Sequence, residues 1–208
     1  MHTGYIVFRR LRRPEEFENY RSRGDYMNKL LIAADQMPDI IRELAEKISA
    51  AHSGDNYALV GIHQQGVPLA ALLQAEIARI SGFRPELAKL DISMYRDDIG
   101  SHLPHIRETE VPFDVNDRVL ILVDDVLSSG RTIRAALDAL TDYGRPGIIR
   151  LAVLIDRGGA EFPIRADFVG RQIELPPDHR VTVRFEADGE PGIYDTVWEK
   201  KNHPETKE

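Results

Sequence analysis

Apolar residues recur along much of the chain at the three- and four-residue spacing of a helix face. The clearest case predicts an amphipathic helix with the apolar positions Met37, Ile40, Ile41, Leu44, Ile48 and Ala51. The same spacing predicts a second helix over residues 69–80 and a third over residues 133–143. Pro68 suits the first turn of the second helix and Gly144 follows the third, which are the positions that these residue types favour at helix ends.

Other segments show the patterns of strands. Residues 57–62 and 119–123 are continuous apolar runs, as in strands that are buried on both faces. Residues 149–155, 166–170 and 181–185 are interpreted as three more strands. Apolar and polar residues alternate over residues 87–94, which predicts a half-buried strand whose buried side chains are those of Ala88, Leu90, Ile92 and Met94.

Strands and helices follow each other in this order, which indicates parallel strands, right-handed crossovers and an α/β fold with a doubly wound sheet. We expect one domain, because the chain contains no internal repeat and no low-complexity tract. Residues 1–27 lack a sustained period and are interpreted as an N-terminal extension. Residues 95–118 are polar and rich in charge, and a loop of this length in a compact domain is usually a functional lid or an interaction segment.

The composition narrows the class of protein. The chain has no cysteine, which excludes disulfides, thiolate catalysis and cysteine metal sites. Its longest apolar runs are too short to span a bilayer, and no secretory signal opens it, so we predict a cytoplasmic enzyme or regulator that has no membrane partner. The net charge of −7 argues against nucleic acid as an obligate partner, since phosphate contacts need clustered lysine and arginine.

The most informative segment is LILVDDVLSSGRT at residues 120–132. Its paired acids, Asp124 and Asp125, follow a buried strand, at the end of the sheet where ligands of α/β proteins bind. Buried carboxylates need partners, so the pair indicates ribose-like hydroxyls or a metal ion. Residues 128–132 then supply hydroxyl groups and backbone N–H groups at a helix start, a combination suited to a phosphate. A sugar phosphate could touch both features.

Two alternative interpretations explain less of this segment. The acids could simply begin a turn while Ser129 caps the helix, but that leaves the doubled acid and the SSGRT run unexplained together. A nucleotide-triphosphatase loop requires G-x-x-x-x-G-K-[ST]. Gly61 and Gly66 have the required glycine spacing but are followed by Val67 and Pro68, and the Gly130-Arg131-Thr132 run lacks the upstream glycine.

VDDVLSSGRT at residues 123–132 resembles the phosphoribosyl pyrophosphate (PRPP) signature of type I phosphoribosyltransferases. Further segments narrow the resemblance to the pyrimidine-operon attenuator and uracil phosphoribosyltransferase family (PyrR), over roughly residues 28–195. These segments are LDISMYRDD at 90–98, VPFD at 111–114, RTIRAA at 131–136, YGRP at 143–146, LAVLIDRG at 151–158 and PIRADFVG at 163–170. The resemblance sets the expected domain at residues 28–195 and leaves residues 196–208 as a tail.

The resemblance implies a type I phosphoribosyltransferase-like fold with a long lid loop and a small C-terminal hood. It implies conversion of uracil and PRPP to UMP and pyrophosphate with Mg²⁺, which Asp124 and Asp125 would hold indirectly, through PRPP and water. These acids and Arg96 are the implied catalytic residues. The implied substrate-binding residues are Gln64, Gln65 and Gly66 at the pyrophosphate; Leu127, Ser128, Ser129, Gly130, Arg131 and Thr132 at the 5′-phosphate, with Val126 before them; Tyr95, which with Arg96 and the following loop would close over the site; and Arg157 and the backbone of Phe168 and Val169 at the base.

The chain departs from the family pattern in ways that affect function. The usual Thr-Arg-Gly of the pyrophosphate turn is Gln64-Gln65-Gly66, so one cation aimed at the leaving group is missing and we expect low turnover. Arginine is absent at Gln65 and Ala160, where the family could use it to bind RNA. The alternatives are a UMP- and PRPP-sensing attenuator that binds the leader RNA of a pyrimidine operon, and a phosphoribosyltransferase for another base. A homo-oligomer is also expected.

Overall fold

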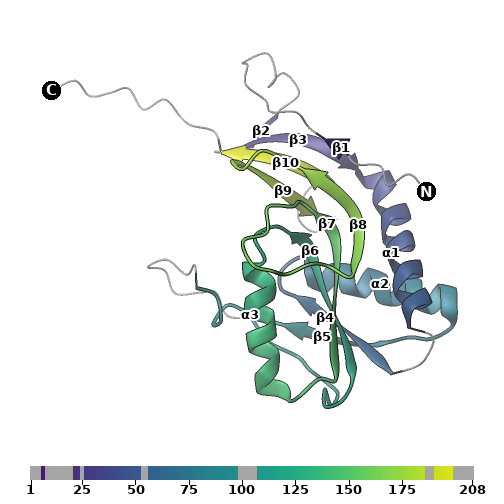
Figure 1. The fold of residues 1–208 in the computed structure, drawn as a ribbon. Coiled ribbons are helices and arrows are strands. Elements are labelled where there is room, and N and C mark those ends of the chain that lie inside the picture. The colour runs from purple at the N-terminus through teal and green to yellow at the C-terminus, as the bar shows by residue number, and fades with distance from the viewer. Residues whose placement is uncertain are drawn as a thin grey trace, which may run out of the picture.

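The computed structural model describes residues 6–7, 21–23, 26–52, 56–97, 107–185 and 190–198. Among them, six strands form a parallel sheet in the order β1-β8-β7-β6-β4-β5 (Figure 1). Their bounds are Ile6–Val7 (β1), Phe168–Glu174 (β8), Ile148–Asp156 (β7), Val119–Leu127 (β6), Tyr57–Ile62 (β4) and Glu86–Leu90 (β5). The described residues also form a four-stranded antiparallel sheet, which we call the hood. It consists of β2 (Arg21–Arg23), β3 (Tyr26–Ala33), β10 (Gly192–Trp198) and β9 (His179–Arg184).

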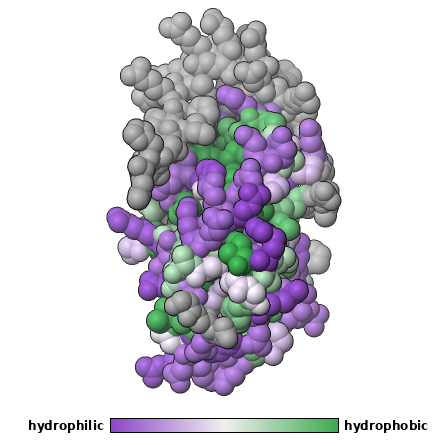
Figure 2. Space-filling view, turned by 90° about the vertical axis from the view of Figure 1, so that its right-hand side faces the viewer, coloured by the Kyte–Doolittle hydropathy of each residue, from purple (hydrophilic) through white to green (hydrophobic). Residues whose placement is uncertain are grey.

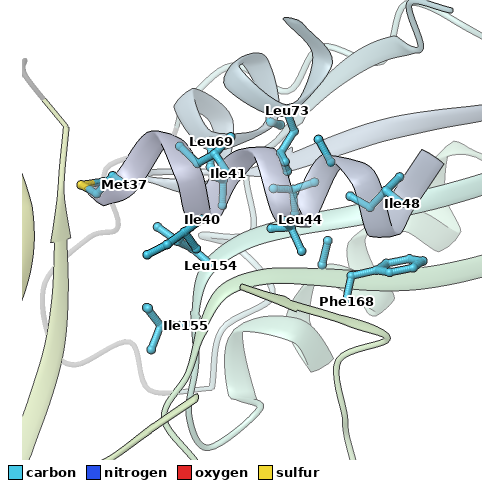
Figure 3. Close-up of a cluster of buried hydrophobic side chains, with 14 of the residues drawn as sticks. Met37, Ile40, Ile41, Leu44, Ile48, Leu69, Leu73, Leu154, Ile155 and Phe168 are labelled. Atoms are coloured by element: carbon cyan, nitrogen blue, oxygen red, sulfur yellow. The ribbon is translucent and has the colours of Figure 1, made fainter. Parts of the chain in front are cut away.

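Helices cover both faces of the parallel sheet, which confirms the predicted doubly wound architecture (Figure 1). Helices α1 (Met37–Ala51) and α2 (Gly66–Ser81) pack together on one face. Helix α3 (Arg131–Leu140) covers the other, and the 3₁₀ turns η2 (Ala34–Gln36) and η3 (Thr141–Tyr143) adjoin α1 and α3. Figure 3 shows the apolar face of α1 directed at β7 and β8, where Ile40, Leu44 and Ile48 lie over Leu154 and Phe168.

Several predicted element bounds shift in the structure, and three of these shifts affect the site. Helix α2 begins at Gly66 rather than after Pro68, because a proline fits within the first turn, where N–H groups lack helical partners anyway. Strand β5 ends at Leu90, and Met94 is 65% exposed instead of buried, because the chain turns at residues 93–95. Strand β6 continues to Leu127, so both acids lie inside the strand rather than after it.

The hood is built from both ends of the domain and is not C-terminal alone, which corrects the expectation. Strand β3 escaped the sequence analysis because its polar Asn28 is buried while its apolar Leu30 is 49% exposed, the reverse of the usual pattern. The proposed domain bounds at residues 28 and 195 both fall inside hood strands. Apart from β1, β2 and the start of β3, the expected extension lies outside the described residues, as does most of the expected tail.

Hydrophilic residues predominate on the side of the molecule that carries α1 (Figure 2). Charged side chains of α1 pair there with each other and with β8, as in the contacts between Arg42 and Asp39 and between Arg171 and Glu43. Among the helices that the structure describes, none is long and apolar enough to cross a lipid bilayer.

Candidate active site

The site lies at the carboxyl edge of the parallel sheet, between β4 and β6. From β4 the chain continues through α2 to β5, which is the next strand outward. From β6 it continues through α3 to β7 on the opposite side. The winding therefore reverses between β4 and β6, and α/β proteins bind their ligands at such a point.

A cavity of about 440 Å³ opens at this point, and we call it the switch-point cavity. Seven of its lining residues were candidates from the sequence: Gln64, Gln65, Arg96, Asp124, Asp125, Val126 and Thr132. Five others were not expected there: His63, Asp91, Ile92, Ser93 and Arg107. The volume lies within the range of small-molecule sites.

The paired acids lie at the floor of this cavity. Asp124 is 5% exposed, and its Oδ1 accepts a hydrogen bond of 3.0 Å from the backbone N–H of Asp125. Burial, followed by the charge of Asp125, raises the pKa of Asp124 well above its ordinary value. Burial also raises the pKa of Asp125, although hydrogen bonds to its carboxylate oppose the rise. The pair is therefore electrostatically unfavourable when both acids are ionised, and ribose hydroxyls or a cation would relieve it.

The turn after β4 is fixed by a glycine. A Cβ atom at Gly66 would lie 2.3 Å from the carbonyl oxygen of Val123 in β6, so a larger residue cannot fit without moving the turn. The backbone N–H of His63 donates a hydrogen bond of 3.0 Å to the carbonyl of Leu90. These contacts hold Gln64 and Gln65 at the cavity, beside the N-terminal end of α2.

Residues 107–110 form a segment that is fixed beside the cavity, and its Arg107 lines the cavity. Glu110 exchanges two backbone hydrogen bonds of 2.9 Å with Lys89, and the backbone N–H of Arg107 donates to Asp91 Oδ2 at 2.5 Å. Burial raises the pKa of Asp91, but hydrogen bonds from Ser93 and from the Arg107 backbone outweigh it, and the net pKa is lowered. Asp91 therefore acts as a charged anchor for this segment. This role of Asp91 was not predicted, because its partner Arg107 lies within residues 95–118, which the sequence pattern indicates only as one loop.

A second cavity of about 550 Å³, the hood cavity, adjoins the first at Val126. We call residues 128–132, where the sequence predicts a phosphate site, the phosphate turn. The lining of the hood cavity combines this turn with the hood and neighbouring segments: Val126, Ser128, Ser129, Arg157, Gly159, Glu161, Leu175, Pro177, His179, Arg180 and Val181. Strand β9 and the segment before it therefore line this cavity, although nothing in their sequence indicates a site. None of the five lining residues in this part of the chain was predicted from the sequence: Leu175, Pro177, His179, Arg180 and Val181.

The phosphate turn has the geometry expected of an anion site at a helix start. Gly130 is the N-cap of α3 with φ of 90°, and a Cβ atom there would lie 3.3 Å from that of Phe162. The carbonyl of Ser129 accepts backbone hydrogen bonds from Glu161 and Phe162 at 2.9 and 3.1 Å. The segment after β7 thus supports the turn through backbone hydrogen bonds, while Ser128 and Ser129 line the hood cavity and Thr132 lines the switch-point cavity.

Arg157 joins the phosphate turn to the hood. Its guanidinium donates to Ser128 Oγ at 3.1 Å and to the carbonyls of Pro176 and His179 at 2.9 and 2.7 Å. Burial lowers its pKa, as expected for a cation removed from water. In the hood, the Nδ1 atom of His179 lies 2.9 Å from both carboxylate oxygens of Asp195, and both residues are buried. These polar contacts fix the wall of the hood cavity.

The structure does not bring every candidate residue into the two cavities. The hydroxyl of Tyr95 donates to Asp142, away from the lining residues. Phe168 pairs with Ala152 and Val169 with Val153, in the middle of β7 rather than at its carboxyl end, so neither reaches the hood cavity. The side chain of Leu127 is buried in the core, and that of Arg131 turns outward to Glu161 and Asp97. The rest of the expected lid, over residues 98–106, lies outside the described residues.

Within the described ranges, no three histidine or acidic side chains stand close enough to hold a metal ion by themselves. The paired carboxylates of Asp124 and Asp125 are hard oxygen ligands at one point of the sheet. Mg²⁺ is commonly bound by one or two carboxylates together with substrate phosphates and water. The donor set therefore fits a magnesium ion that enters with a phosphorylated ligand.

A family model described as phosphoribosyl transferase domain matches residues 31–188. The bifunctional protein PyrR of Roseiflexus sp. (strain RS-1) is 48% identical over 165 residues, which cover 77% of this chain and 90% of that protein. The protein of the same name from Thermus aquaticus is 46% identical over 175 residues, 82% and 96% of the two chains. A solved hypoxanthine-guanine phosphoribosyltransferase from Bacillus anthracis matches with a TM-score of 0.61 at 19% identity, over 81% of this chain and 96% of that one. The predicted type I phosphoribosyltransferase-like fold is confirmed.

Proposed function

The chain belongs to the PyrR family of phosphoribosyltransferases, and on this premise we propose that it converts uracil and PRPP to UMP and pyrophosphate. The observation that carries the proposal is the junction of the two cavities at Val126. One cavity holds paired acids beside a helix start, and the other lies between a phosphate turn and the hood. A phosphoribosyl group can therefore bridge two sites, one for its leaving group and the other for the incoming base.

Each part of PRPP has a matching surface in this arrangement. The ribose hydroxyls would donate hydrogen bonds to Asp124 and Asp125, whose charges then face partners instead of each other. The 5′-phosphate would lie on residues 128–132, at the N-terminal end of α3. The pyrophosphate would extend toward the turn at residues 63–66, and the base would enter the hood cavity.

In the reaction, the bond between ribose C1′ and the pyrophosphate oxygen breaks, and both electrons leave with the oxygen. The lone pair of uracil N1 forms the new bond to C1′, and the N1 proton is released to water. Positive charge develops at C1′ and negative charge on the leaving group. The contribution of the protein is to hold the two reactants in line and to stabilise these charges.

Phosphoribosyltransferases generally use Mg²⁺ with PRPP, and Asp124 and Asp125 would hold the ion through PRPP and water. When bound, the ion would partly neutralise the pyrophosphate charge. The carboxylates themselves orient the ribose, and the cation beside them would favour their ionised form.

The decisive experiment is a panel assay with PRPP, Mg²⁺ and one nucleobase at a time, in which nucleotide and pyrophosphate are both measured. We expect UMP from uracil, with at least a hundredfold lower kcat/KM for hypoxanthine, guanine and orotate, because a site built for particular hydrogen-bonding groups can discriminate by up to about 10⁴–10⁵-fold. The double variant Asp124→Asn/Asp125→Asn provides the inactive control. A comparable or greater rate with another base would refute uracil as the substrate.

A regulatory role in pyrimidine biosynthesis is the second part of the proposal, and it rests on family membership. The chemistry of such a role would be binding to a leader RNA, and its affinity would fall steeply with salt because phosphate contacts dominate. The exposed residues Gly159, Ala160 and Glu161 contribute no cation. Binding of a structured leader RNA at low salt tests this part separately from the assay. A cytoplasmic location also stays a prediction.

A further inference from the structure

The switch-point cavity contains an arginine from outside the turn where the sequence motif would place one. Arg107 lines the cavity together with Gln64 and Gln65. When the amide of Gln64 is oriented to satisfy its neighbours, its oxygen accepts hydrogen bonds of 3.1 Å from both terminal nitrogens of the Arg107 guanidinium. This partner is a neutral amide and not a carboxylate, so the contact itself does not neutralise the guanidinium.

The backbone around Arg107 is fixed from several sides. Its N–H donates to Asp91 at 2.5 Å, and the hydroxyl of Thr109 accepts from the backbone N–H of Asp91 at 3.0 Å. The Nε2 atom of His63 lies 3.3 Å from the carbonyl oxygen of Glu108. Glu110 completes the attachment through its backbone bridge to Lys89. These contacts bind the segment to β5 and to the turn after β4, which places the Arg107 side chain at one end of the cavity.

The other arginine of the cavity, Arg96, has a different partner. Arg96 donates to Thr132 Oγ1 at 3.4 Å, beside the start of α3, where the 5′-phosphate would bind. Arg107 instead contacts Gln64, in the turn that follows β4. A pyrophosphate leaving group at that turn would approach a guanidinium and the N-terminal end of α2 together, which is a favourable environment for an anion.

We propose that Arg107 is a catalytic residue that contacts the pyrophosphate of PRPP and stabilises it as it leaves. The inference deepens the proposed phosphoribosyltransferase function and rests on it. As the bond from C1′ to oxygen breaks, both electrons pass to the pyrophosphate oxygen, and the guanidinium offers charge-assisted hydrogen bonds to the growing negative charge. Gln64 holds the guanidinium toward the turn while the site is free.

The test compares wild type with Arg107→Gln and Arg107→Lys, and uses Arg145→Gln as a matched control. Arg145 is an exposed arginine outside both cavities. We expect Arg107→Gln to lower kcat by roughly 10²–10³-fold and to weaken the binding of inorganic pyrophosphate with Mg²⁺ at least tenfold. The KM for uracil and the affinity for UMP should stay within twofold. Arg107→Lys should lower kcat and pyrophosphate affinity less than Arg107→Gln does, because lysine keeps the charge but not the planar fork.

Moving the cation provides a second test that a structural role would not pass. In the Arg107→Gln background, Gln65→Arg should recover at least tenfold in kcat, since it returns a guanidinium to the same turn. Normal turnover and pyrophosphate binding in Arg107→Gln would overturn the proposal, as would a parallel loss of UMP binding, which would indicate damage to the fold. If wild type binds pyrophosphate in an Arg107-dependent manner but forms no UMP, the anion contact is supported and the proposed reaction fails.

Discussion

Replacing the paired acids Asp124 and Asp125 of the switch-point cavity with asparagine should abolish function while sparing the fold. Asparagine has the size of aspartate, and its side-chain oxygen can still accept the 3.0 Å hydrogen bond from the backbone N–H of residue 125. Its amide cannot supply the negative charge that ribose hydroxyls would contact. The double variant Asp124→Asn/Asp125→Asn therefore separates ligand binding from packing.

The expected magnitudes follow from burial and charge. A hydrogen bond to a charged group contributes about 1.5–3 kcal/mol, so loss of one such bond should weaken PRPP binding by roughly 10- to 150-fold. Removing two adjacent buried charges should stabilise the ligand-free protein near neutral pH, by about 0.5–2 kcal/mol if the gain is typical of stabilising substitutions.

The stability gain should depend on pH with a defined sign. Burial, and then the charge of Asp125, raises the pKa of Asp124 above its ordinary value of 3.8. Between pH 3.8 and the raised pKa, Asp124 keeps its proton in the folded state but loses it in the unfolded chain. The stability that this acid contributes is therefore fully present below the unfolded-state pKa. That stability is lost as the pH rises through the folded-state pKa. The double variant should therefore exceed wild type in stability near neutral pH, and the difference should shrink at about pH 4.

Urea unfolding at several pH values and titration with PRPP and Mg²⁺ measure the two effects. Asp138→Asn provides the matched control, because this exposed aspartate pairs with Arg134 on α3 outside both cavities. The control should bind PRPP like wild type. The reasoning would be refuted if the double variant lost stability near neutral pH while its PRPP affinity stayed intact.

Three further substitutions test the rest of the site. Gly66→Ala should lower the free energy of unfolding, measured by urea titration, by about 1–3 kcal/mol. The Cβ atom of the alanine would lie 2.3 Å from the carbonyl oxygen of Val123. Unchanged stability would contradict this close packing. Arg157→Lys should raise the KM for uracil about tenfold in steady-state assays, a change that needs only about 1.4 kcal/mol. Lysine cannot reproduce the fork that joins Ser128 to the carbonyls of Pro176 and His179. An unchanged KM would argue against a role at the base. Tyr95→Phe should leave the KM for PRPP within twofold, because the hydroxyl bonds to Asp142 and not to the cavity, and a larger rise would show that Tyr95 acts on PRPP.

The parallel sheet could be predicted because its central strands and helices are strongly patterned. Tyr57–Ile62 is buried throughout, and the apolar face of α1 is the one expected from its spacing. The hood could not be predicted in the same way, because its interior is partly polar. Asn28 and Thr196 are buried there with a 3.0 Å hydrogen bond between their side chains. A buried polar pair satisfies its hydrogen bonds only in the assembled sheet, so neither strand alone shows a recognisable pattern.

The candidate site was predictable where one segment carries several functional groups. The acids and the phosphate turn lie within residues 124–132, and the strand and helix that flank them fix their geometry. The hood cavity, where we propose that the base binds, draws on residues separated by long stretches of chain, such as Ser128, Arg157 and His179. Phe168 and Val169 were expected there, but strand register places them in the middle of the sheet. A residue's position along a strand depends on its pairing partners, which the segment itself does not encode.

The count of cations at the leaving group shows what a motif-by-motif interpretation omits. Judged by the turn at Gln64 and Gln65 alone, the pyrophosphate loses a guanidinium, and low turnover is the natural expectation. The bridge between Lys89 and Glu110 returns the chain to the same cavity and brings Arg107 with it. Electrostatic stabilisation depends on where a charge lies and not on which segment supplies it. In our proposal, Arg107 supplies from another segment the guanidinium that the turn lacks at Gln65. Turnover should therefore depend on Arg107 more than on residue 65.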